Sequence, residues 1–76
     1  MYTLLDTVVV SRDLPAHGLR RGDLGAVVQI YPPDGIEVEF VLASGRTQSL
    51  VSLRLTDVRP VAAGDLIAVR ELQQTA

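Results

Sequence analysis

The chain has 76 residues, with seven Lys or Arg against nine Asp or Glu, one histidine and no cysteine. This length predicts one small domain, and the net charge of −2 argues against general binding to nucleic-acid phosphates. The lack of cysteine excludes disulfides, thiol nucleophiles and cysteine-based zinc sites. No stretch has the pattern of a signal peptide or the length of a membrane span, so we expect a cytoplasmic protein without membrane contact.

The chain begins with a predicted strand and a loop. Leu4–Ser11 reads as the first strand, centred on three consecutive valines. Arg12–Gly18 contains a proline and ends in glycine, which predicts a loop with at most one helical turn. Leu14 and Leu19 flank most of this loop, and we expect them to fold back and cap the core.

The stretch Leu19–Tyr31 predicts a tight turn that leads directly into a second strand. Gly22 and Gly25 stand three residues apart, where a reversing chain needs positive φ or a close backbone approach. Asp23 lies between them and can hydrogen-bond to its own local backbone. Ala26–Tyr31 is almost entirely apolar or aromatic, which favours an extended, half-buried strand.

A hairpin follows, and its turn residues are Pro32, Pro33, Asp34 and Gly35. Proline suits the second position of a type I turn, and glycine suits a left-handed position that closes the hairpin with a bulge. The next five residues, Ile36–Phe40, alternate strictly between apolar and polar side chains. This alternation directs Ile36, Val38 and Phe40 to the core and directs Glu37 and Glu39 to water or to a partner.

The residues from Ala43 to Val61 predict a second tight turn, a fourth strand, a 3₁₀ turn and a closing strand. Ala43–Arg46 predicts a tight turn with Gly45 in the left-handed position, and Thr47–Val51 predicts the fourth strand. Ser52–Asp57 is too short for an α-helix, and a single 3₁₀ turn there would place Leu53 or Leu55 over an open end of the barrel. Val58–Val61 is expected to be a closing strand at an edge, because it contains Pro60.

The segment from residue 62 to residue 76 is expected to be a C-terminal extension. It predicts an extra strand, a short helix capped by Asp65, or a frayed tail, with residues 73–76 frayed in each case. Gly64–Val69 repeats Gly22–Val27 at five of six positions. The repeat is either a chance match or a duplicated turn-strand unit.

Five or six short strands separated by turns predict an all-β domain, a small antiparallel barrel. Four segments then carry a resemblance: Leu19–Val28, Val38-Glu39-Phe40, Gly45-Arg46-Thr47 and Leu53–Val61. Together they resemble a family of small bacterial and cyanobacterial domains, domain of unknown function 4926, over about residues 3–61. The resemblance implies an SH3-like antiparallel barrel spanning residues 1–61. The Gly-Asp-x-Gly-x-Val stretch is also similar to the KOW motif of ribosomal and transcription-elongation proteins.

No residue pattern points to catalysis, a metal or a cofactor. His17 has no nucleophile and no orienting carboxylate in a recognisable spacing, so it reads as an exposed loop histidine. Glu37 and Glu39 share one strand face, and alternation by itself explains them as a solvated outer face. We therefore predict that the protein is not an enzyme and that it has no catalytic site, metal site or cofactor.

The function predicted from these residues is a non-catalytic protein-interaction module, an accessory subunit or the neutralising partner of a neighbouring gene product. It would dock on an unidentified protein through its loops, a surface formed by Arg20, Arg21 and Tyr31, or an open strand edge.

The alternative function is a KOW-like RNA- or ribosome-associated domain whose arginines contact RNA phosphates. The candidate binding residues are Arg20, Arg21, Tyr31, Glu37, Glu39 and Arg46, and the structural turn residues are Gly22, Asp23, Gly25, Asp34, Gly35 and Gly45. The arginines are otherwise solvated or paired with Asp23, Glu37 or Glu39, and the protein is a monomer or a weak homodimer.

Overall fold

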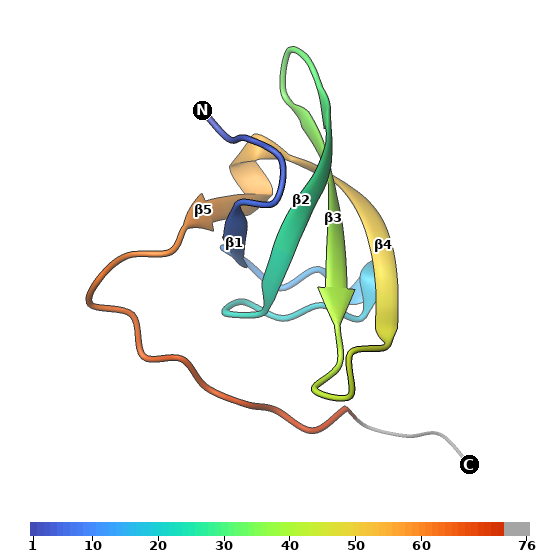
Figure 1. The fold of residues 1–76 in the computed structure, drawn as a ribbon, viewed down its shortest axis with the longest axis vertical. Helices are drawn as coiled ribbons and strands as arrows, with labels where there is room; N and C mark the ends of the chain where they lie inside the picture. Colours follow the sequence, from blue (N-terminus) through green and yellow to red (C-terminus); the bar gives the residue numbers. More distant parts are fainter. Residues whose placement is uncertain (73–76) are drawn as a thin grey trace.

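A computed structural model describes residues 1–72, which form five β-strands and two short 3₁₀ helices (Figure 1). The strands are β1 (Thr7–Val10), β2 (Leu24–Tyr31), β3 (Gly35–Val41), β4 (Thr47–Arg54) and β5 (Val58–Pro60). The 3₁₀ helices are η1 (Pro15–His17) and η2 (Leu55–Asp57). The predicted fraying of residues 73–76 lies outside the described residues. No helix within residues 1–72 is long and apolar enough to cross a membrane.

The five strands form one antiparallel sheet in the order β4-β3-β2-β1-β5, so β4 and β5 are its edges. The predicted all-β class, with five antiparallel strands and a 3₁₀ turn, is confirmed. The first strand starts later than predicted, because Thr3–Asp6 forms a turn in which the Thr3 N–H donates to the Asp6 carboxylate at 2.9 Å. The fourth strand continues to Arg54, so the second 3₁₀ turn begins only at Leu55.

The core lies on one face of this sheet. Alternation along β3 places Ile36, Val38 and Phe40 inside, as predicted, where they are at most 5% exposed. They pack with Val8, Val10, Leu14, Leu19, Val27, Val51, Leu53 and Val58. Leu14 and Leu19 form an isolated bridge that closes the first loop, so the prediction that they cap the core is confirmed. Leu55 packs half-buried against the same cluster from η2.

The two glycines before β2 serve two different purposes. Gly22 has a φ of +97°, which L side chains rarely adopt, and the chain reverses there. Gly25 lies inside β2, where an added Cβ would clash with the side chain of Val38 and lie 2.9 Å from Cε1 of Phe40. Gly22 therefore confirms the prediction of a positive φ, and Gly25 confirms the prediction of a close approach. Gly45 is also left-handed, at φ +92°, as predicted.

The β2–β3 hairpin turn differs from the predicted one. The turn consists of residues 32–34, and its Pro32–Pro33 peptide bond is cis. Gly35 is the first residue of β3, paired with Tyr31, and its φ is not positive. The predicted left-handed Gly35 and its closing bulge are therefore wrong, because residues 32–34 reverse the chain and Gly35 already pairs with Tyr31. The sheet does contain register shifts at two other places, between Val27 and Gln29 in β2 and between Phe40 and Val41 where β3 pairs with β4.

Residues 61–72 leave β5 and form neither a strand nor a helix. Gly64–Val69, which repeats the sequence of Gly22–Val27, shares only the structure of its turn. In both turns the aspartate N–H donates to the carbonyl three residues earlier, from Asp23 to Arg20 and from Asp65 to Ala62, at 3.0 Å in each case. Only the first copy continues as a strand, because only β2 has neighbouring strands with which to pair.

Candidate functional site

The most distinctive surface feature is an extended stretch of the C-terminal part, Asp65–Arg70, which we call the clamped segment. Arginine–aspartate pairs hold both of its ends. Arg59 on β5 donates from Nη1 and Nη2 to the two carboxylate oxygens of Asp65, at 2.8 and 2.9 Å. Arg70 donates from Nε and Nη2 to the two oxygens of Asp23, both at 2.7 Å, and also to the Gly18 carbonyl. Such bidentate pairs fix geometry as well as charge.

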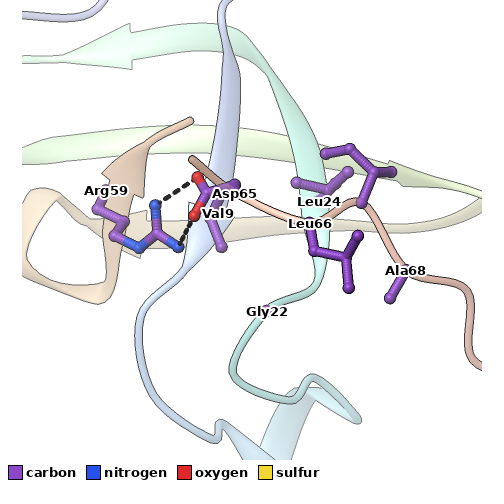
Figure 2. A pocket seen from close by; sticks show the side chains of 8 residues that line it. Val9, Gly22, Leu24, Arg59, Asp65, Leu66 and Ala68 are labelled. Atoms are coloured by element: carbon purple, nitrogen blue, oxygen red, sulfur yellow. Dashed lines mark hydrogen bonds and ion pairs between the residues drawn. The ribbon is translucent and has the colours of Figure 1, made fainter. Parts of the chain in front are cut away.

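The clamped segment lies across the outer face of the sheet. Val9 on β1 is paired with Leu24 on β2 and with Arg59 on β5, so these three side chains form a row on one face. Val8 and Val10 point to the core, so this row faces the opposite side. Val9 is nevertheless only 4% exposed, because the segment passes over it. Figure 2 shows Asp65 and Leu66 beside Val9 and Leu24, with Arg59 holding Asp65.

The clamped segment exposes its own aliphatic side chains. Leu66 is 91% exposed, Ile67 is 62% exposed and Val69 is 96% exposed. The backbone N–H and C=O groups of residues 66–69 form no hydrogen bonds with other backbone groups within residues 1–72. The segment is therefore an extended apolar stretch that is held in place at its ends but is not paired along its length.

Both aspartates of the clamp are ionised at neutral pH. The hydrogen bond from Arg59, together with that from the Ala62 N–H, lowers the pKa of Asp65 to about 2. Burial alone would raise the pKa of Asp23, but hydrogen bonds from Arg70 and from the Arg20 N–H outweigh burial, and the pKa falls below its ordinary value. Both carboxylates therefore carry the negative charge that their arginine partners require at neutral pH.

Removing one end of the clamp should free the segment without unfolding the sheet. We expect Arg70→Ala to raise severalfold the rate at which thermolysin cuts within residues 66–69, because the segment then leaves the protein surface more often. The melting temperature should change little, since ion pairs near the surface contribute modestly to stability. Arg21→Ala is the matched control, because Arg21 forms no ion pair with any residue among 1–72. Equal cutting of both variants and the parent would show that the pair does not hold the segment.

Turns that are closed by an aspartate side chain recur along the chain. This pattern could have identified the two aspartates of the clamp from the sequence. In four turns the carboxylate accepts a hydrogen bond from the N–H three residues earlier. These aspartates are Asp6, Asp23, Asp57 and Asp65. All but Asp6 also form an ion pair with an arginine at least six residues away in the sequence. The sequence predicts the local bond of Asp23, which is confirmed, but not the arginine that each carboxylate receives.

The candidate binding residues lie at both ends of the sheet. Arg20 and Arg21 lie beside Arg70, in shallow grooves at the end of the clamped segment. Arg46 lies in the β3–β4 turn, and Figure 1 places this turn at the same end of the sheet as the start of β2. Tyr31 is the last residue of β2 and lies at the other end, 47% exposed. The structure therefore does not bring Arg20, Arg21 and Tyr31 into one surface.

Glu37 and Glu39 lie on the outer face of β3, half-buried by neighbours on β4. Glu37 accepts a hydrogen bond from the Ser52 hydroxyl at 2.7 Å, and Glu39 accepts one from the Thr47 hydroxyl at 2.5 Å. Neither carboxylate forms an ion pair with an arginine within residues 1–72. The ion-pair partner of Asp23 is Arg70, not the side chain of Arg20 or Arg21.

His17 lies exposed at the end of η1. No group of three or more His, Cys, Asp or Glu side chains among residues 1–72 could hold a metal ion.

The cavity beneath the clamped segment has a volume of about 70 Å³. Pockets that bind drug-sized ligands usually measure about 300–1,000 Å³. The cavity is lined by Val9, Gly22, Leu24 and Arg59 on the sheet side and by residues 65–68 above it (Figure 2). It is therefore a packing gap between segment and sheet, and the distinctive surface is the segment itself.

Comparison with known proteins identifies a family for this chain. No curated protein and no solved structure gives a significant match. The sequence profile of the family described as Domain of unknown function (DUF4926) matches residues 4–60, well over half of the chain. The matched region ends with β5 and stops before the clamped segment. The resemblance seen in the sequence is confirmed: this chain belongs to the DUF4926 family.

Proposed function

We propose that this protein is a non-catalytic protein-interaction module and that a protein partner binds the clamped segment. The observation that carries the proposal is the exposure of Leu66, Ile67 and Val69 on a segment that two bidentate pairs hold in place. Exposed apolar side chains that cluster on an ordered surface are typical of interaction sites. The unpaired backbone of residues 66–69 adds hydrogen-bonding capacity for a partner strand.

The surroundings of the clamped segment support a protein partner with acidic groups. Arg20 and Arg21 lie at its end and form no ion pairs within residues 1–72. Since the segment is already extended and anchored, a partner would lose less affinity to ordering it than to ordering a free tail. The sheet order β4-β3-β2-β1-β5, with a 3₁₀ turn between β4 and β5, supports an SH3-like scaffold for this role. We assign it as a cytoplasmic accessory subunit or neutralising partner.

The test is capture of the partner from native lysate with tagged protein, with and without nuclease, followed by mass spectrometry. We expect one specific protein in both samples, and its loss with the variant Leu66→Ser/Val69→Ser. The matched control is Leu4→Ser/Val41→Ser, which removes two exposed aliphatic side chains elsewhere, 57% and 49% exposed, and should retain the partner.

Two outcomes would contradict the proposal. If the partner is captured equally well by Leu66→Ser/Val69→Ser, the segment is not the binding site. If only ribosomal proteins or RNA are captured, and nuclease removes them, the KOW-like RNA-binding function replaces the proposed one. In that case affinity should fall steeply as salt is added, because counterion release drives binding to phosphates.

A further inference from the structure

The part of the sheet beneath the clamped segment, which we call the covered face, has the features of a peptide-binding site. It consists of Val9, Leu24, Arg59 and Asp23 (Figure 2). Val9 and Leu24 form its apolar middle, while Arg59 and Asp23 place one positive and one negative group at its two ends. All four residues lie within the region that the family profile matches, and the clamped segment lies outside it. The family domain therefore supplies the face, and a separate stretch of the chain covers it.

The covered face holds the clamped segment through the charged ends of the contact. Arg59 donates two hydrogen bonds to Asp65, and Arg70 donates two to Asp23. Between these ends, residues 66–69 form no hydrogen bonds with other backbone groups within residues 1–72, and their side chains are exposed. A gap of about 70 Å³ remains beneath the segment. The contact therefore selects a carboxylate and a guanidinium five positions apart in an extended chain, and little of the sequence between them.

The charges of the covered face make an empty face unfavourable. The Asp23 side chain is only 15% exposed, and without Arg70 its carboxylate would keep only the hydrogen bond from the Arg20 N–H. A carboxylate with so little contact with water is destabilising unless a cation compensates its charge. The Arg59 side chain is 46% exposed, so its charge is better solvated. The face therefore favours a ligand that brings a guanidinium to Asp23 and a carboxylate to Arg59.

We propose that the covered face is a peptide-binding site, which the clamped segment occupies within its own chain and which an extended segment of a partner protein occupies by displacing it. The partner segment carries an acidic residue and an arginine five positions apart, as Asp65 and Arg70 are. Five steps of extended chain span about 17 Å, so a segment whose charges lie closer together reaches only one end of the face. The tethered segment competes at an effective concentration of about millimolar, so the partner binds once the clamp is weakened.

The test uses the full chain with Asp65→Asn and Arg70→Gln, which removes both clamping charges of the segment and leaves the covered face intact. The probe is a synthetic peptide with the sequence of residues 61–72. We expect the backbone amide NMR signals of Val9 and Leu24 to shift with saturation as the peptide is added. The affinity should be at least about tenfold higher than that of the parent chain, whose own segment occupies the face. A control peptide of the same composition, with its arginine directly after its aspartate, should bind at least about tenfold more weakly than the probe, because it reaches only one end.

A third substitution in the double variant tests the face itself. Arg59→Gln should weaken binding of the probe about tenfold, because it removes the partner of the peptide carboxylate. Arg46→Gln is the matched control and should leave binding unchanged, since Arg46 lies in the β3–β4 turn and forms no ion pair within residues 1–72. If the double variant loses the circular dichroism spectrum of the parent, Arg70→Gln alone takes its place in the titration.

Three results would overturn the proposal. The first is the absence of a saturable shift at millimolar peptide, and the second is equal binding of the two peptides. The third is equal affinity of the parent and the double variant for the probe, which would place the peptide elsewhere on the surface. The exposed side chains of residues 66–69 are unchanged in these variants, and the signals come from beneath the segment. The result is therefore independent of the proposed function.

Discussion

Gly25→Ala is expected to destabilise the protein by about 3 kcal/mol, near the upper end of the usual cost of overpacking a core. The new Cβ would clash with the Val38 side chain and lie 2.9 Å from Cε1 of Phe40 and 3.1 Å from the Glu39 carbonyl oxygen. Val38 is fully buried and Phe40 is 5% exposed, so neither can move without disturbing other core residues. In so small a domain this loss should lower the melting temperature by more than about 10 °C.

Gly64→Ala is the matched control for this measurement. Gly64 lies in the turn that echoes the one before β2, but an added Cβ meets no atom within 4 Å, and the glycine does not have positive φ. Its free energy of unfolding should therefore stay within about 0.5 kcal/mol of the parent. Urea unfolding of both variants measures the difference. Equal stability of the two would mean that β2 and β3 do not approach each other as closely as the structure shows.

Asp57→Ala is expected to cost about 2–3 kcal/mol, because it leaves hydrogen-bond donors without their partner. Asp57 is 6% exposed and is the buried charged residue of the described chain. Its carboxylate accepts from Nε and Nη2 of Arg12 at 3.0 and 2.7 Å and from the Arg54 N–H at 3.0 Å. The bonds from Arg12 join the loop after β1 to η2 across 45 residues of sequence. Asp34→Ala is the control: Asp34 is exposed and should change stability by less than about 0.5 kcal/mol.

The cost of Asp57→Ala should depend on pH. Burial alone would raise the pKa of Asp57, but the hydrogen bonds from Arg54 and Arg12 outweigh burial and lower it. A carboxyl group whose folded pKa is lowered adds stability above its unfolded pKa of about 3.9, and this stability is lost as pH falls toward the folded pKa. The gap in unfolding free energy between parent and variant should thus shrink below about pH 4. A gap that stays constant to pH 2 would show that the charge of Asp57 does not stabilise the fold.

Much of the fold follows from local patterns. The alternation of Ile36–Phe40 predicts which side chains enter the core, because successive residues of a strand face opposite sides. Gly22 and Gly45 mark left-handed turns, since few other residues adopt positive φ. The hairpin turn was harder, because its residues permit more than one turn length, and only the pairing of Gly35 with Tyr31 shows where the turn ends.

The candidate site depended on contacts that sequence patterns do not encode. Asp23 was identifiable as a turn residue, because its carboxylate can bond to a nearby backbone N–H, whereas Asp65 was expected to cap a short helix and instead closes a turn. Their arginine partners were not identifiable: Arg70 reaches Asp23 from 47 positions away, and no local pattern indicates that pairing. Likewise, the exposure of Leu66, Ile67 and Val69 contradicts what apolar composition usually means, since such residues are normally buried.

The sequence by itself therefore determined the all-β class, the approximate positions of the five strands, the family and the core face of β3, because these depend on side-chain periodicity and turn chemistry over a few neighbouring residues. Only the tertiary structure decided which face of the sheet the C-terminal segment covers and that β4 and β5 form the two edges of the sheet. Gly64–Val69 repeats the residues that begin β2, yet it forms no strand, because a strand exists only where another strand supplies its hydrogen bonds. Whether a neighbouring strand is present depends on which distant parts of the chain meet in space.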